Sequence, residues 1–331
     1  MMNTPNSSRL RNPAPLARFA WATLACNVAV VLWGAYVRAT GSGAGCGDKW
    51  PLCGGPIVGA SARAQTIIEF THRMTSGIAL VMVACLVVWC WRVTSRGDWR
   101  RYSSALAAVL VINEALLGAG LVLLKHVAQD KSAARVFYLC LHFGNTLLLL
   151  GTLALTAGWL SNGSRRFTLV RKARQVVAVS IGLLATMTIG ITGAIAALAD
   201  TLFPATSLRA SFLQDFSPAA PKLLHFRLLH PLVAVIAASY VVWVVLSSSK
   251  PRSRVSPLAI GVIITVLVQV ALGILNVLLL TPIWLQILHL LVGDVFWILL
   301  VLASAELMLE DVSSRPLPAE LNPMPTEKAC V

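Results

Sequence analysis

Charged residues are scarce in this sequence. Asp, Glu, Lys and Arg together make up 12% of the 331 residues, whereas hydrophobic residues make up 57%. The mean hydropathy is +0.77. Because soluble globular domains contain about 25% charged residues, these values exclude an ordinary soluble domain. They predict an integral membrane protein.

Eight apolar stretches are long enough to cross a bilayer, which takes roughly 20 residues in a helix. The predicted fold is therefore all-α, with eight transmembrane helices. We expect these helices near residues 19–37, 73–91, 104–125, 136–160, 175–197, 230–248, 257–280 and 284–305.

Acidic residues are the scarcer charged class, and the formal net charge is +14. If the N-terminus is inside, the N-terminal tail and the inner loops hold fifteen basic residues and one acidic residue, Asp98. The positive-inside rule then predicts that both termini are cytoplasmic, and the charge requires no nucleic-acid partner. The fifteen are Arg9, Arg11, Arg18, Arg92, Arg96, Arg100, Arg101, Arg165, Arg166, Arg171, Lys172, Arg174, Lys250, Arg252 and Arg254.

The N-terminal segment is short and polar, and the first apolar run continues into a long helix that does not end in an A-x-A-like cleavage site. Residues 1–18 are therefore expected to be a cytoplasmic tail and not a removed signal peptide. Arginines are too sparse in this segment for a transit peptide. The sequence thus favours the bacterial plasma membrane over an organelle.

Only six histidines are present, and four of them recur at related places in the apolar segments: His72, His142, His230 and His289. With the predicted topology, His72 and His230 fall at the start of the second and sixth helices. The other two fall one to two turns into the fourth and eighth helices, so all four are expected near the outer face. His126 and His225 have no counterpart in the other half and are expected to be structural.

The two halves of the chain resemble each other. Four helices repeated in the same orientation predict two four-helix bundles related by a pseudo-two-fold axis along the membrane normal. The expected bundles are 19–160 and 175–305, with a cytoplasmic linker at 161–174 and a cytoplasmic tail at 306–331. The segments that align are 69–89 with 227–245, 139–155 with 286–302, and EALLGAGLVLL (114–124) with VALGILNVLLL (270–280).

An ionisable residue inside a membrane is costly and is a functional candidate. A single histidine could be only a hydrogen-bonding residue, but four at equivalent positions favour a cofactor. Imidazole is an axial haem ligand, and bundle interiors can hold cofactors between facing helices. Zinc is disfavoured because no carboxylate or thiol accompanies each pair. The histidines therefore predict two haem sites.

Of the seven cysteines, only Cys46 and Cys53 face the oxidising compartment in the predicted topology. The six residues between them allow a disulfide. Two interpretations stay open, a structural cross-link and a redox-active pair. The third outer loop, 199–224, lacks cysteine, which excludes a second disulfide there.

Glu69 lies three residues before His72, on the same helical face. Its negative charge could simply interact favourably with the dipole at the start of the helix. Alternatively, it could accept a proton or stabilise a cation at the edge of a porphyrin. The second half has Arg227 at this position, so chemistry is expected in the first half. Glu114 and Asp294 lie inside helices, where we expect them to bond to a neighbouring helix or to be protonated. A proton path is the alternative.

The chain resembles haem A synthase, an eight-helix membrane enzyme of cytochrome oxidase assembly, over about residues 20–305. The motifs that carry the resemblance are GAYVRATGSGAGCGDKWPLC (34–53), EFTHRMTSG, LHFGNTLLLL, RLLHPLVAV and LHLLVGDVFW. The resemblance implies oxidation of the C8 methyl of haem O to a formyl group through successive hydroxylations, which gives haem A.

Residue roles follow from the same resemblance. It implies that His72 and His142 flank the substrate haem, whereas His230 and His289 hold a resident haem B. It implies that Glu69 is the catalytic carboxylate and that Cys46 and Cys53 are the outer-loop pair of the family. Arg38 and Arg73 match basic positions, and pairing with haem propionates is their expected role.

One departure concerns the sixth helix. The chain reads His230-Pro231, where the family commonly has His-Arg. Arg227 could supply the missing cation. Proline at the first turn of a helix is tolerated because its missing N–H would be unpaired anyway, and we expect Pro231 at such a place.

Two other functions are weighed against the enzyme. A dihaem b-type electron carrier coupled to quinone needs the four histidines but neither Glu69 nor the cysteines. A transporter built on a parallel repeat predicts no bound haem. The expected partners of the enzyme are a haem O synthase, membrane lipid and an electron acceptor that the sequence does not identify. Self-association stays open.

Overall fold

The computed structural model describes residues 14–47, 49–53, 63–161, 167–169, 173–248 and 256–311. The predicted all-α fold with eight helices long and apolar enough to span a membrane is confirmed. These helices are α1 (Ala14–Ala39), α2 (Ala64–Val93), α3 (Trp99–Leu123), α4 (Ala133–Ser161), α5 (Ala173–Leu202), α7 (Lys222–Ser248), α8 (Pro257–Leu278) and α9 (Ile283–Met308).

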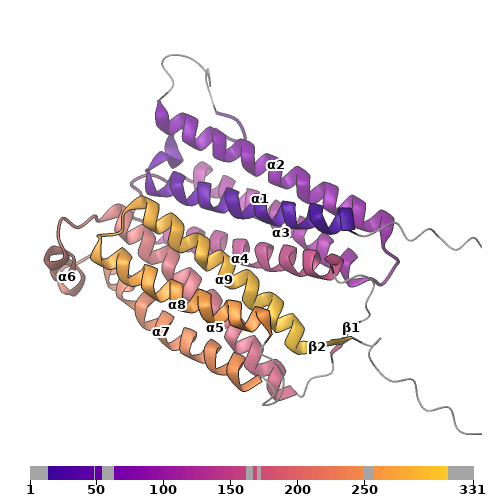
Figure 1. Cartoon of the computed structure of the whole chain (residues 1–331). Coiled ribbons are helices and arrows are strands. Elements are labelled where there is room, and N and C mark those ends of the chain that lie inside the picture. The colour runs from indigo at the N-terminus through magenta and orange to yellow at the C-terminus, as the bar shows by residue number, and fades with distance from the viewer. Residues whose placement is uncertain are drawn as a thin grey trace, which may run out of the picture.

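Three short features complete the described elements. A 3₁₀ turn, η1 (Ser42–Ala44), follows α1, and a nine-residue helix, α6 (Leu208–Phe216), lies between α5 and α7. Two strands, β1 (Phe167–Leu169) and β2 (Leu309–Asp311), pair antiparallel. The strands lie at the opposite end of the molecule from α6 (Figure 1).

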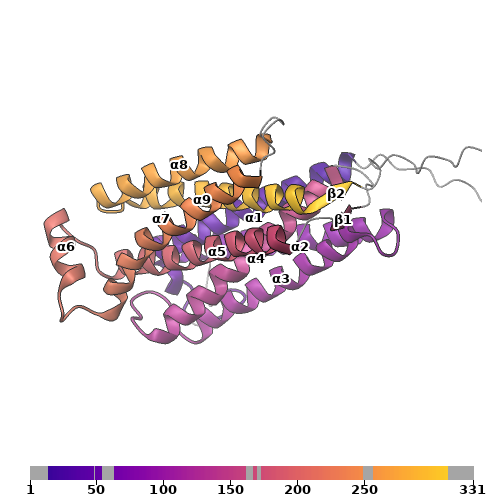
Figure 2. The ribbon, with the colours of Figure 1, turned by 90° about the horizontal axis from the view of Figure 1, so that it is seen from below.

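The long helices form two groups that lie side by side (Figures 1 and 2). Helices α1 to α4 pack on one another, and so do α5, α7, α8 and α9. Between the groups, α1 and α4 contact α5 and α9. The two groups thus meet along one central seam, which is formed by α1, α4, α5 and α9.

Small residues and one buried indole close this seam. The Trp297 Nε1 atom on α9 donates to the Leu147 carbonyl on α4 at 2.7 Å. A Cβ at Gly151 would lie 3.3 Å from Trp297 Nε1, and a Cβ at Gly190 would lie 2.8 Å from Phe143 Cε1. Close approach at small residues is the usual way in which membrane helices pack. The largest buried cluster accordingly includes residues of both groups.

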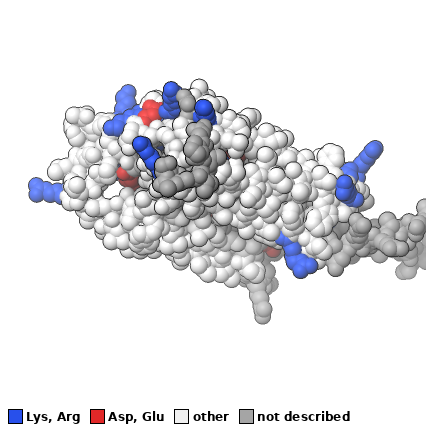
Figure 3. All heavy atoms as spheres, turned by 90° about the horizontal axis from the view of Figure 1, so that it is seen from above, with Lys and Arg blue, Asp and Glu red and all other residues white. Residues whose placement is uncertain are grey.

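The outer surface is apolar along its middle. Large exposed side chains such as Val81, Val109, Leu184 and Leu267 point away from the bundle, and bilayer lipid would cover them. Lys, Arg, Asp and Glu gather toward the two ends of the face in Figure 3, and the band between them is mostly uncharged. This pattern fits a multi-pass membrane protein.

Two predicted helix starts are wrong. Helix α2 begins at Ala64 and α7 at Lys222, well before the expected residues 73 and 230. Hydropathy misses these first turns because they are polar, yet their polar side chains find partners. Thr66 Oγ1, for example, donates to the Gly45 carbonyl at 2.7 Å. Consequently all four histidines lie about two turns inside their helices.

The expected position of Pro231 is also wrong. It lies inside α7, about two turns from the helix start, and not in the first turn. Proline at an interior position removes the hydrogen bond that its N–H would donate to the carbonyl four residues earlier. Here that carbonyl belongs to Arg227, in the turn directly before His230.

The alignment of the third and seventh spans is wrong by one residue. Helices α3 and α8 end in the same way, at C-caps Leu124 and Leu279. The next residues, Lys125 and Leu280, both have φ near +60°. The N–H groups of His126 and Thr281 then bond back to Leu121 and Asn276. When the two helices are aligned on these shared ends, Gly118 corresponds to Gly273 and Glu114 corresponds to Gln269. The sequence alignment instead matches Glu114 with Val270.

Several expectations concern residues outside the described part. They include most of the N-terminal tail, the linker around β1, and the C-terminal tail after Asp311. Cytoplasmic placement of the termini therefore stays a prediction. The basic residues of the orientation argument that lie there are Arg9, Arg11, Arg165, Arg166, Arg171, Lys172, Lys250, Arg252 and Arg254.

Replacing Trp297 tests the seam between the two groups. Trp297→Phe removes the donor to Leu147 and is expected to lower the free energy of unfolding by about 1 kcal/mol. Thermal unfolding in detergent measures the change. Trp243→Phe is the control, because that side chain is 56% exposed and lies on α7, outside the four helices that form the seam. Equal losses in both variants would contradict the importance of this bond.

Candidate functional site

Each of the four histidines packs against a glycine on a neighbouring helix. The pairs are Gly34 with His72, Gly118 with His142, Gly193 with His230, and Gly273 with His289. A Cβ at these glycines would lie 3.0, 3.7, 3.0 and 3.6 Å from the Cε1 atom of the histidine, respectively. The contacts join α1 to α2, α3 to α4, α5 to α7, and α8 to α9. The same arrangement therefore occurs twice in each half.

Sequence reasoning missed these glycines. Each lies in the C-terminal half of the helix that precedes a histidine-bearing span, so the signal was present at fixed places of the repeat. A glycine within a helix usually costs stability. A glycine that recurs beside a histidine in this way indicates a close approach that the site requires.

The second-half histidines face each other. The ring centroids of His230 and His289 are 6.5 Å apart, with an interplanar angle of 89°. A metal ion binds imidazole nitrogen at about 2 Å, so two imidazoles on opposite sides of one ion have centroids about 6 Å apart. The His230 and His289 side chains thus fit the axial positions of one haem iron.

The Nδ1 ring nitrogens of the four histidines differ in their hydrogen bonding. The Nδ1 atoms of His72, His142 and His289 are buried and have no hydrogen-bond partner among the described residues, and Nδ1 of His230 lies 3.3 Å from Thr192 Oγ1. No group of three or more His, Cys, Asp or Glu in the described ranges could hold a metal ion. A pair of imidazoles would suit haem, in which the porphyrin supplies the other ligands of the iron.

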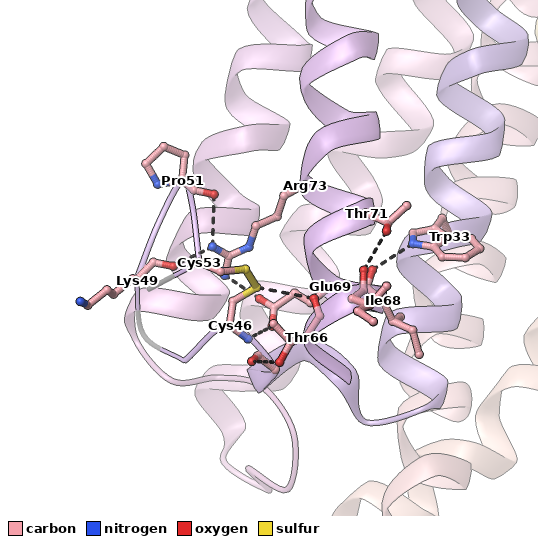
Figure 4. The surroundings of a disulfide bond; sticks show 12 residues. Trp33, Cys46, Lys49, Pro51, Cys53, Thr66, Ile68, Glu69, Thr71 and Arg73 are labelled. Atoms are coloured by element: carbon pink, nitrogen blue, oxygen red, sulfur yellow. Dashed lines mark hydrogen bonds and ion pairs between the residues drawn. A yellow bond between two sulfur atoms is a disulfide. The ribbon is translucent and has the colours of Figure 1, made fainter. Parts of the chain in front are cut away.

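Glu69 is buried beside the loop that follows η1, and both of its carboxylate oxygens have partners. Oε1 accepts from Arg73 Nη2 at 2.6 Å, and Oε2 accepts from the Cys46 backbone N–H at 2.8 Å. Arg73 Nη1 also donates to the carbonyls of Lys49 at 2.6 Å and Pro51 at 3.2 Å. Figure 4 shows Glu69 and Arg73 reaching from α2 toward this loop. The ion pair therefore fastens the loop one turn from His72.

The predicted disulfide between Cys46 and Cys53 is confirmed, with Cα atoms 4.6 Å apart. It lies directly against the ion pair, because the Cys46 N–H is a donor to Glu69 (Figure 4). A Cβ at Gly45 would lie 2.4 Å from the Gln65 carbonyl oxygen, so this turn requires glycine. The disulfide thus holds a short loop tightly on the start of α2.

In the second half, a cation takes the place of the carboxylate. Arg227 donates from Nη1 to Asp200 Oδ1 at 2.8 Å and from Nε to Asp215 Oδ1 at 3.0 Å, and it also reaches Ser211. These bonds fix α6 to the ends of α5 and α7. The two halves therefore share the histidine positions but carry opposite charges one turn away.

Arg38 joins the two halves. Its Nη1 atom donates to the Ala197 carbonyl and to Thr201 Oγ1, both at 2.6 Å, and Nη2 donates to Gln286 Oε1 at 3.1 Å. These partners lie on α5 and α9. Ala197 is one turn from Gly193, Thr201 lies one turn further on, and Gln286 is one turn from His289. Pairing of Arg38 and Arg73 with haem propionates stays a prediction. In the structure, both guanidinium groups already have protein partners.

The remaining polar residues behave differently from one another. Glu114 accepts hydrogen bonds from Asn145 Nδ2 at 2.5 Å and from Thr146 Oγ1, both on α4. The expected bond to a neighbouring helix is therefore present. Asp294 is buried, and its Oδ2 has no partner among the described residues. His126 Nδ1 lies 2.9 Å from Asp130 Oδ2. His225 Nε2 lies 3.2 Å from the Ser217 carbonyl.

Comparison with known proteins supports a single family. A model of the family described as cytochrome oxidase assembly protein matches residues 17–301. A protohaem IX farnesyltransferase of Thermus thermophilus is 40% identical over 302 residues, which are 91% of this chain and 48% of that protein. The chain thus spans about half the length of this relative.

Shorter matches involve proteins named haem A synthase. The one from Alkalihalophilus pseudofirmus is 35% identical over 146 residues, which are 44% of this chain and 46% of that protein. The one from Halalkalibacterium halodurans is 38% identical over 128 residues, which are 39% of this chain and 40% of that protein.

The glycine contacts generate a matched pair of variants. In Gly193→Ala, the new methyl group would lie 3.0 Å from His230 and is expected to displace the ring. In Gly273→Ala, the methyl group would lie 3.6 Å from His289, which is ordinary van der Waals contact. We expect the first variant to lose most of its bound haem and the second to keep it, as measured by visible absorption per protein. Equal haem contents would contradict the proposed role of the close contact.

Proposed function

The chain belongs to the cytochrome oxidase assembly protein family, and we propose that it is a haem A synthase. This enzyme would oxidise the C8 methyl of haem O to a formyl group through successive hydroxylations. The observation that carries the proposal is the repeated glycine–histidine contact, combined with Glu69 in one half only. The matches to proteins named haem A synthase support the same activity.

The histidine pairs have different roles in this proposal. His72 and His142 would flank the substrate, haem O, in the first half. His230 and His289 would hold a resident haem B, as their 6.5 Å ring separation supports. Haem B supplies a one-electron redox centre when bound. Gly193 and Gly273 keep space beside the two rings, and the seam around Trp297 excludes lipid from between the halves.

Glu69 would be the catalytic carboxylate. It is buried, and Arg73 and the Cys46 N–H hold its two oxygens. A carboxylate so oriented can stabilise positive charge that develops at the substrate methyl, or accept a proton from water there. In the second half, Arg227 occupies the equivalent place and is paired with Asp200 and Asp215. No carboxylate stands at that position of the helix, which supports chemistry in the first half alone.

The proposal also includes partners and a location. We propose water as the source of the formyl oxygen. Oxidation of the methyl group with one water molecule then releases four electrons and four protons, so the enzyme requires an electron acceptor, which we place at the outer face. The Thermus thermophilus relative is named for farnesyl transfer to protohaem IX and is about twice as long as its matched part. This supports a haem O synthase as the partner that supplies substrate. We place the protein in a bacterial plasma membrane, with both termini cytoplasmic.

Co-expression with a haem O synthase tests the proposal in a host that lacks haem A. Extracted haems would be separated by chromatography with mass detection. Haem A or its hydroxylated precursor is expected. If haem O is present but unconverted, the dihaem electron carrier is favoured instead. Haem O in a parallel culture without the synthase would indicate that this chain transfers the farnesyl group.

Replacing Glu69 tests its catalytic role. Glu69→Gln retains an acceptor for the Cys46 N–H but removes the charge. We expect haem A formation to fall by about 10²–10⁴-fold, with haem B content unchanged. Glu306→Gln is the control, because Glu306 lies at the far end of α9, where it accepts from Ser256. Near-normal conversion by Glu69→Gln would refute the role.

Alanine variants of the histidines test the separate roles that are proposed for the two histidine pairs. His230→Ala and His289→Ala are expected to lose the resident haem B. His72→Ala and His142→Ala are expected to keep it and to lose conversion of haem O. Haem content and product can be measured on the same preparations. Equal loss of haem B in all four variants would contradict the assignment.

A further inference from the structure

A second carboxylate lies beside one of the first-half histidines. Glu114 Oε1 on α3 is 3.4 Å from His142 Nδ1 on α4. This nitrogen is buried and lacks a partner with hydrogen-bond geometry among the described residues. Gly118, one turn along α3, faces the Cε1 atom of the same ring. The ring therefore lies between a carboxylate and a glycine of one helix.

The Glu114 carboxylate is held firmly in this position. Asn145 Nδ2 donates to its Oε2 at 2.5 Å, and Thr146 Oγ1 donates to its Oε1. Asn145 is itself fixed, because its Oδ1 accepts from Asn113 Nδ2 at 2.8 Å and its Nδ2 donates to the Leu110 carbonyl at 2.9 Å. Such a network orients the acceptor toward His142 before any ligand is bound.

The second half has no such carboxylate at the corresponding place. In the register of α3 and α8, Gln269 is the residue that corresponds to Glu114. Gly293 stands where α4 has Thr146, four residues after the histidine. A Cβ at Gly293 would lie 2.9 Å from Gln269 Nε2, so the amide occupies the space of that side chain. His289 Nδ1 and Gln269 Oε1 both lack partners in the described part of the chain.

We propose that Glu114 is a positioning residue that accepts a hydrogen bond from Nδ1–H of His142. This bond fixes the tautomer and leaves Nε2 as the nitrogen available to the iron of the substrate haem. Hydrogen bonds of this kind are often long without ligand and shorten in the complex. The inference rests on the proposed function, because it assigns His142 to the substrate haem.

The expected consequence is electronic. A carboxylate that accepts the Nδ1 proton makes the imidazole a stronger donor to a metal, which stabilises the oxidised iron and lowers its reduction potential. A neutral amide at Gln269 does this much less for the other haem. The two sites would therefore differ in potential, although their histidine–glycine contacts are the same.

Spectroelectrochemistry on the full-length protein, purified and loaded with haem O in addition to its resident haem, tests this inference. Glu114→Gln should shift the midpoint potential of the haem O site upward and leave the other potential unchanged. Glu114→Asp should restore part of the shift. The mirror variant, Gln269→Glu, should lower the potential of the other haem.

Unchanged potentials in Glu114→Gln, with both haems bound, would overturn the inference. If Glu114→Gln loses haem O, the test rests on Glu114→Asp and Gln269→Glu. If neither of these variants shifts a midpoint potential, the inference is overturned as well. Haem A formation by the unsubstituted protein is measured in parallel. Its absence would refute the proposed function, whereas haem A formation with unmoved potentials would refute only the role of Glu114.

Discussion

The structure depends on one repeated contact, in which a histidine ring occupies the space that a side chain on the adjacent helix would fill. An imidazole inside a membrane is costly unless it is shielded from lipid and has a partner. Glycine at Gly34 or Gly193 lets the helices approach until the ring is enclosed. The contact therefore fixes both the spacing of the helix pair and the depth of the histidine.

The two halves use this contact with different charges around it. Beside His72 stands Glu69, paired with Arg73, whereas beside His230 stands Arg227, paired with Asp200 and Asp215. Beside His142 stands Glu114, whereas beside His289 stands Gln269. Under the proposed function, the shared scaffold binds a haem in each half, and Glu69, whose place is taken by Arg227 in the second half, limits the chemistry to the first half.

Hydropathy and residue spacing were sufficient for part of this account. The eight spans, the four histidines and the Cys46–Cys53 pair could be found because each leaves a local pattern in the sequence. The first turns of α2 and α7 could not, since Glu69 and Arg227 make those turns polar and their partners lie in separate loops. The contact of Arg38 with Ala197 joins residues 159 apart, and no local pattern contains it. The one-residue error between α3 and α8 arose because apolar helices align nearly as well in several registers.

The haem content of the purified protein tests the central claim most directly. We would measure haem per chain by absorption, and identify each haem by mass, after expression with a haem O synthase. The account predicts two haems per chain, one haem B and one carrying the farnesyl group or its oxidised products. A chain with no haem, or with a single haem that is lost equally when either half is altered, would contradict the account of two sites on a repeated scaffold.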